Sequence, residues 1–237
     1  MSKLVRCMIS FSTIVLFIIS IGPVAEGKAY CDLDMDEGTV CMIAAYDLRP
    51  MQKAVGMRQV NASVADIQNM DADSLQDYIN DEKIPIIVGP DGNFYMTDRH
   101  HMVFALYTAK GQRLPLLVAK VKKNWSHLSE QKFWRNMYQK NYVYLFDEFG
   151  LPLADHSEIP EQISDLKNDP YRSLAWAVRE RDGFDKTDVP FAEFQWANYF
   201  RPRLDVGNTD REFERAVTLA LQLAAHKDAS HLPGFKN

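Results

Sequence analysis

Long apolar segments are scarce in this sequence, and this limits how the chain can meet a membrane. The one long apolar run covers residues 8–22; it follows Lys3 and Arg6 and leads to small residues that end at Gly27. A basic start, a short apolar stretch and small residues are typical of a secretory signal peptide, whereas a membrane span needs about 20 apolar residues. We therefore predict a signal peptide over residues 1–27 and export to the periplasm or the medium. An uncleaved anchor is the alternative; after cleavage, no later segment is a candidate for a stable membrane span.

Cysteine is also rare. Of three cysteines, Cys7 lies in the predicted signal peptide, and Cys31 and Cys41 remain. An even pair in an exported chain predicts a disulfide, here within an N-terminal segment at residues 28–46. The pair is not a Cys-x-x-Cys, which argues against a redox-active dithiol. The loop between them is rich in carboxylates, but its spacing matches no EF-hand calcium loop.

The chain has no excess of positive charge. Its formal charge is −5 at pH 7, and it becomes −6 when Lys3, Arg6 and Glu26 leave with the signal peptide. An acidic protein does not attract polyanions over its whole surface. The composition therefore excludes a general nucleic-acid coat, and any binding of nucleic acid or nucleotides requires a local basic site.

Repeats and low-complexity linkers are absent from the sequence, and the pattern of elements divides near residue 125. We predict an α+β fold, with a small mixed sheet and helices over residues 47–125, followed by a mostly helical extension over 126–237 packed on that core. The expected strands are residues 55–60, 84–88, 93–97 and 114–121, with a hairpin turn at 89–92, and the expected helices are 71–79, 101–110 and four that begin near 129, 170, 190 and 210.

The segment that favours chemistry is Asp98-Arg99-His100-His101, where a strand leads into a helix. The N–H groups and dipole at a helix N-terminus favour anions, and arginine offers a planar fork to phosphate oxygens. A histidine can exchange a proton near neutral pH, so His100 and His101 are candidate general bases or acids. Asp98 can orient an imidazole, hold a divalent metal or simply cap the helix. Adjacent helical residues point in different directions, so both rings need not share one site.

The motif Asp-Arg-His-His-x-x-x-Ala-Leu after a short strand resembles the signature of the ParB-like nuclease family, a divergent branch of the ParB/sulfiredoxin superfamily. Other segments resemble the same family in the same order, over about residues 45–203; they include 48–52, 55–58, 84–89, 126–129, 169–174 and 186–194. The resemblance implies a ParB/sulfiredoxin-like core whose turn binds phosphate groups. Arg99 stands where sulfiredoxins have their reactive cysteine, which argues against sulfiredoxin chemistry.

The resemblance implies phosphodiester hydrolysis at this turn. Arg99 would stabilise phosphoryl charge, and four more residues would complete the phosphate site: Arg49, Gln52, Arg58 and Lys186. A divalent metal, Mg²⁺ or Mn²⁺, is compatible with Asp98. The alternatives are a non-catalytic phosphate- or nucleotide-binding protein and a nucleotide-dependent phosphotransferase. For Arg172 and Glu193, which lie between apolar positions, the alternative to a site is a buried ion pair.

Overall fold

A mixed sheet forms the centre of the protein, of which the computed structural model describes residues 28–236. Five strands pair in the order β1-β6-β4-β5-β2, with both parallel and antiparallel neighbours. Their bounds are β1 (Val40–Ile43), β2 (Leu48–Pro50), β4 (Ile84–Val88), β5 (Phe94–Met96) and β6 (Leu117–Asn124). The predicted mixed sheet is thereby confirmed. So is the hairpin, because β4 and β5 pair antiparallel around a turn in which Gly92 has a positive φ of 81°.

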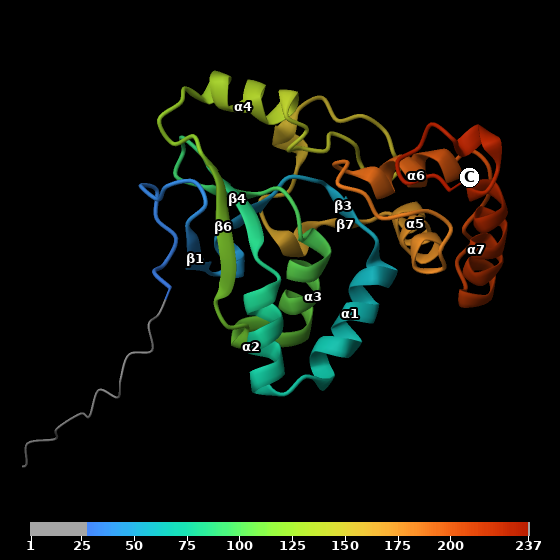
Figure 1. The fold of residues 1–237 in the computed structure, drawn as a ribbon, viewed down its shortest axis with the longest axis horizontal. Coiled ribbons are helices and arrows are strands. Elements are labelled where there is room, and N and C mark those ends of the chain that lie inside the picture. The colour runs from blue at the N-terminus through green and yellow to red at the C-terminus, as the bar shows by residue number, and fades with distance from the viewer. Residues whose placement is uncertain (1–27, 237) are drawn as a thin grey trace, which may run out of the picture.

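Helices cover both faces of this sheet (Figure 1). One face packs on α1 (Met57–Asn69), α2 (Ala72–Asp81) and α3 (His100–Lys110), in a core that contains Ile84 and Ile86. The other face contributes Ile87 and Tyr95 to a separate core with Phe133 and Met137 of α4 (Glu130–Gln139). The alternation along β4 and β5 thus separates two apolar layers, as expected for successive strand residues.

Helix α1 differs from the sequence prediction, which placed a strand at residues 55–60. A two-residue strand, β3 (Ala54–Val55), pairs with β7 (Lys167–Asn168), and the chain then turns into α1 at Gly56. The first α1 N–H groups find acceptors far away in sequence: Met57 donates to Asn168 Oδ1 and Arg58 to Ser173 Oγ. The start of this helix is therefore stabilised by tertiary contacts that local periodicity does not encode.

The C-terminal half is mostly helical, as the sequence predicted, and α5, α6 and α7 form a core of their own (Figure 1). It contains α5 (Pro170–Glu180), α6 (Ala192–Phe200) and α7 (Asp210–Ala224). Trp196 and Phe200 of α6 are fully buried against α5 and α7. Short 3₁₀ helices occupy several connections: η1 (Ala45–Asp47), η2 (Gly111–Arg113), η3 (His156–Glu158), η4 (Ile163–Asp165) and η5 (Lys227–Ala229). The α+β fold class is confirmed, whereas the proposed division at residue 125 stays a prediction.

The N-terminal segment joins the sheet through β1 and carries the predicted disulfide. Cys31 and Cys41 are bonded, with their Cα atoms 4.9 Å apart. The predicted signal peptide lies outside the described residues. Among residues 28–236, no helix has the length and apolar character needed to cross a membrane.

Candidate functional site

The turn between β5 and α3 places a strained residue directly before the helix. Thr97 closes β5 by donating its N–H to Pro85 O at 3.0 Å. Arg99 then adopts a left-handed conformation with φ 71° and ψ 16°, and its N–H donates to Asp98 Oδ1 at 2.7 Å. A non-glycine residue in this region costs about 1–3 kcal/mol and persists only where the surroundings enforce it. The turn is thus held in a conformation that the local sequence does not prefer.

Both histidines accept hydrogen bonds from the backbone that follows β2. His100 Nε2 accepts from Met51 N at 3.0 Å, and His101 Nε2 accepts from Gly56 N at 2.9 Å. The His100 side chain is buried, at 3% exposure. The two rings therefore fasten the segment between β2 and α1 to the first turn of α3.

These contacts keep both rings neutral. Burial lowers the pKa of His100 to about 4, although the charge of Asp98 opposes the shift. Burial also lowers the pKa of His101 well below its ordinary value, with further lowering from Arg172, His100 and Arg179. A neutral ring that accepts at Nε2 carries its proton on Nδ1. In this state each imidazole is a hydrogen-bond donor through Nδ1, and its basic nitrogen is already occupied.

The N-terminus of α3 has no side-chain cap from residues 28–236. Within the described residues, the N–H groups of His100, His101 and Met102 have no acceptor, and no side chain caps this helix. The N-cap side chain does cap four other helices, namely Asp71 on α2, Ser129 on α4, Asp169 on α5 and Thr209 on α7, whereas α1 and α6 also lack an N-cap side-chain bond. The free N–H groups and the dipole at such a helix end favour an anion.

The predicted guanidinium of the turn is already paired. Arg99 Nη2 lies 2.9 Å from Glu82 Oε2, with both side chains about one-third exposed. Arg49 is likewise engaged: its Nη1 lies 2.9 Å from Glu161 Oε2, and its Nε donates to Asn93 Oδ1. To bind a phosphate, Arg99 would have to leave Glu82, and Arg49 would have to leave Glu161.

The other predicted phosphate ligands do not converge on the turn. Gln52 is buried and donates to Ala54 O. Arg58 pairs with Asp210 at 2.8 Å and lies over the ring of Phe213. Lys186 is exposed in the connection before α6, and no hydrogen bond or ion pair among residues 28–236 joins it to the turn.

Two further cations lie near the turn: Arg172, which the sequence analysis left open, and Lys122, which it did not consider. The charge of Asp98 raises the pKa of both Lys122 and Arg172, opposing the larger effect of burial, so both lie within its electrostatic reach. Arg172 is buried and its pKa falls to about 9, mainly through burial and then through the charge of Arg179. Glu193 pairs with both arginines, which is the buried ion pair that the sequence analysis left open. No local signal marks Lys122, a strand residue that only the fold brings near Asp98.

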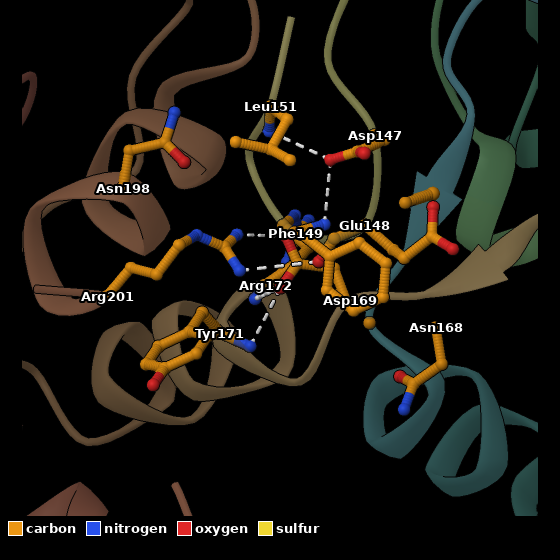
Figure 2. A network of polar contacts seen from close by, with 12 residues as sticks. Asp147, Glu148, Phe149, Leu151, Asn168, Asp169, Tyr171, Arg172, Asn198 and Arg201 are labelled. Carbon is orange, nitrogen blue, oxygen red and sulfur yellow. Dashed lines mark hydrogen bonds and ion pairs between the residues drawn. The ribbon is translucent and has the colours of Figure 1, made fainter. Parts of the chain in front are cut away.

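A second buried ion pair joins the start of α5 to the end of α6 (Figure 2). Asp169 accepts from the N–H groups of Tyr171 and Arg172 at the start of α5, and Arg201 Nη2 lies 2.8 Å from its other oxygen. Arg201 also donates to Glu148 O. Burial raises the pKa of Asp169 despite the pairing with Arg201. Arg201 Nε is buried and has no hydrogen-bond partner among the described residues. Because Asp169 and Arg201 pair with each other and with neighbouring backbone groups, we do not place this network in the candidate site.

A resident metal is not supported by the donor set. Within residues 28–236, no group of three or more His, Cys, Asp or Glu side chains lies close enough to hold an ion. A divalent ion at Asp98 would thus depend on phosphate oxygens for most of its ligands, as Mg²⁺ often does.

Comparison with known proteins now assigns the family. The family model described as "Putative ParB-like nuclease" matches residues 41–202. The chain belongs to this ParB-like family. It is also similar to a solved structure, the protein Atu1540 from Agrobacterium tumefaciens, with a TM-score of 0.76 and 34% identity over 85% of this chain and 98% of that one. Among curated proteins, none matches the sequence.

Proposed function

We propose that this ParB-like protein binds a phosphodiester at the N-terminus of α3 and hydrolyses it with Asp98. One observation carries the proposal: a helix N-terminus beside Asp98 with three N–H groups that have no acceptor among the described residues. Donors fixed before the ligand arrives stabilise charge that develops on phosphoryl oxygens. The family description, a nuclease, agrees with this ligand class.

The histidines take a different part from that expected of them in the sequence. Their Nε2 atoms accept Met51 N–H and Gly56 N–H, so they are positioning residues for the loop and neutral donors through Nδ1. The group left to take a proton from water is the exposed carboxylate of Asp98. Arg99 joins the site if phosphate displaces Glu82, since arginine binds both carboxylate and phosphate through the same fork.

The test is a cleavage assay on single-stranded DNA, duplex DNA, RNA and nucleotides, with Mg²⁺, Mn²⁺ or a chelator. Asp98→Asn should keep the fold and lose at least about 100-fold in rate, a typical loss for an acid–base residue. Asp47→Asn, an exposed carboxylate in η1, is the matched control and should cleave like the wild type. Cleavage by Asp98→Asn at the wild-type rate would refute the catalytic assignment.

Binding without turnover is the second candidate, and it is favoured by the occupied Nε2 atoms of both imidazoles. Thermal shift in phosphate or a nucleotide, with chloride as the reference salt, separates the two. A phosphate-dependent rise in Tm with no cleavage of any substrate would support capture alone. A phosphate-dependent rise together with Asp98-dependent cleavage would support hydrolysis.

We also propose that the protein is exported from the cytoplasm. It is supported by the signal-peptide pattern of residues 1–27 and agrees with the disulfide between Cys31 and Cys41. The test is expression in a bacterium followed by fractionation and N-terminal sequencing. We expect a mature chain that begins at Lys28 outside the cytoplasm; an intact cytoplasmic chain with free thiols would refute export.

A further inference from the structure

Two arginines of α5, Arg172 and Arg179, share one carboxylate of α6. Glu193 Oε2 pairs with Arg172 Nη2, and Glu193 Oε1 pairs with Arg179 Nη1. Arginine presents the same planar fork to carboxylates and to phosphates. A carboxylate held between two guanidinium groups therefore stands where a phosphate group could be bound. We call Arg172 and Arg179 the arginine clamp.

Glu193 does not satisfy all the donors of the clamp. Arg172 is buried, and its Nη1 donates to Gln59 Oε1 of α1 at 3.2 Å. Its Nε is also buried and has no hydrogen-bond partner within residues 28–236. A buried donor without an acceptor is unfavourable, so an anion that reaches Nε as well as Nη2 would be held better than Glu193 is.

The buried charges around the clamp are not balanced. Three guanidinium groups meet two carboxylates, all at most 20% exposed: Arg172, Arg179, Arg201, Glu193 and Asp169. Two more acids lie nearby, but Glu180, which pairs with Arg179, is 52% exposed, and Asp98 is exposed. Solvent screens exposed charges more than buried ones. The buried part of the network thus keeps one positive charge without a buried partner, which favours an anion.

The helix that carries Glu193 begins in the same way as α3. Phe191, directly before α6, is left-handed with φ 57°, and no side chain of residues 28–236 caps this helix. Glu193 lies in its first turn. The dipole of α6 therefore favours negative charge beside this turn, whether it comes from Glu193 or from a bound phosphate.

The clamp adjoins the first turn of α3. Gly56 donates its N–H to His101 Nε2 at 2.9 Å, and a Cβ on Gly56 would lie 2.8 Å from the backbone nitrogen of Ser173, the residue after Arg172. His101 Nε2 and Ser173 N are therefore within about 8 Å of each other. After the larger effect of burial, the charges of Arg172 and Arg179 both lower the pKa of His101. The clamp and the turn are thus close enough to hold one ligand.

We propose that Arg172 and Arg179 bind a phosphate group of the ligand, and that Glu193 occupies the clamp until this phosphate displaces it. The proposal rests on the proposed function for the class of ligand, and it adds two binding residues and an internal competitor. Because Glu193 belongs to the same chain, its effective concentration at the clamp is high, and it lowers the apparent affinity for phosphate.

Removal of the competitor is the first test. Binding of inorganic phosphate is measured by isothermal titration calorimetry at constant ionic strength, with chloride as the balancing anion. Glu193→Gln should bind phosphate at least about tenfold more tightly than the wild type does. Glu214→Gln removes an acid from the exposed pair with Arg181 and is the matched control, which should bind like the wild type. An affinity of Glu193→Gln equal to or below that of the wild type would overturn the proposal.

Conservative replacement of the cations is the second test. Arg172→Lys and Arg179→Lys keep the positive charge but lose the fork, so each should weaken phosphate binding at least about fivefold. Arg181→Lys, at an exposed pair, is the control and should bind like the wild type. Wild-type affinity in both clamp variants, with circular dichroism unchanged, would overturn the proposal.

A crystal structure of the wild type in phosphate gives a result even if a variant does not fold. We expect a phosphate in contact with Arg172 and Arg179, with the Glu193 carboxylate turned away. A phosphate bound elsewhere while Glu193 still pairs with both arginines, or no bound phosphate, would overturn the proposal.

The two proposals fail separately. If phosphate binding depends on Arg172 and Glu193 but the wild type cleaves nothing, hydrolysis is refuted and the clamp stands. If cleavage depends on Asp98 while Arg172→Lys and Glu193→Gln leave its KM unchanged, the clamp is refuted and hydrolysis stands.

Discussion

Mild acid should destabilise the protein through the histidines that fasten α3 to the loop after β2. Unfolded histidine binds a proton near pH 6.5, whereas burial lowers the pKa of folded His100 to about 4. Between these values the unfolded chain binds more protons, so this stability is complete above pH 6.5 and falls as the pH approaches 4. His101, whose pKa is also lowered, acts in the same direction.

The magnitude follows from proton linkage. For a shift from 6.5 to about 4, His100 alone should remove about 2 kcal/mol of unfolding free energy between pH 7 and pH 5, and about 3 kcal/mol by pH 4. Protonation would also set an N–H at Nε2 against Met51 N–H, which cannot accept it. Acidic groups with lowered pKa values, such as Asp91, titrate below this window.

Urea unfolding followed by circular dichroism from pH 7 to pH 4.5 measures the effect. His100→Gln keeps an acceptor near Met51 N–H but does not titrate, so it should lose stability at pH 7 and show a shallower pH dependence. A double variant with His101→Gln should have a shallower pH dependence still. The remainder comes from His156, whose pKa burial also lowers, and from Asp169, whose pKa burial raises and which acts in the opposite direction. His226→Gln, an exposed histidine, is the control. Equal slopes in wild type and His100→Gln would refute the reasoning.

Three further predictions concern packing and covalent structure. Arg201→Met leaves the Asp169 carboxylate, which is 1% exposed, without its partner and should cost about 3 kcal/mol in urea unfolding, whereas Arg181→Met at the exposed pair with Glu214 should cost little. Gly56→Ala places a Cβ 2.8 Å from Ser173 N and should lower stability by about 1–3 kcal/mol; an unchanged Tm would contradict this close approach. Reduction of Cys31–Cys41 should lower stability by about 2–3 kcal/mol, measured as a drop in Tm with reductant that is absent in a Cys31→Ser, Cys41→Ser double variant.

The elements predicted correctly from sequence are those whose signals are local. The turn at residues 89–92 gives the β4–β5 hairpin, and Asp169 followed by Pro170 marks the start of α5. Both depend on backbone preferences within a few residues. Helix α1 was missed because Gly56 and the acceptors Asn168 and Ser173 are joined only by the fold.

In the candidate site, too, local signals were readable from the sequence, whereas contacts between distant residues were not. The motif located the turn, because the transition from strand to helix is visible in the order of residues. The roles within it depended on distant partners: His100 meets Met51, His101 meets Gly56, and Arg99 meets Glu82. A histidine that accepts a backbone N–H and one that faces a substrate have the same sequence signature. The role of each histidine therefore follows only from its burial and its hydrogen-bond partners in the folded protein.

The strain at Arg99 is best understood together with the free N–H groups that follow it. A left-handed residue before α3 costs about 1–3 kcal/mol that glycine would avoid, and two buried imidazoles add their own desolvation. Despite these unfavourable terms the helix has no side-chain cap, and the first N–H groups of α3 have no acceptor among the described residues. The arrangement leaves a set of N–H donors without acceptors in the first turn of α3, next to Asp98 in the chain. Unpaired donors kept in place despite this strain favour the binding of an anion, which is why we propose the turn as the site of chemistry.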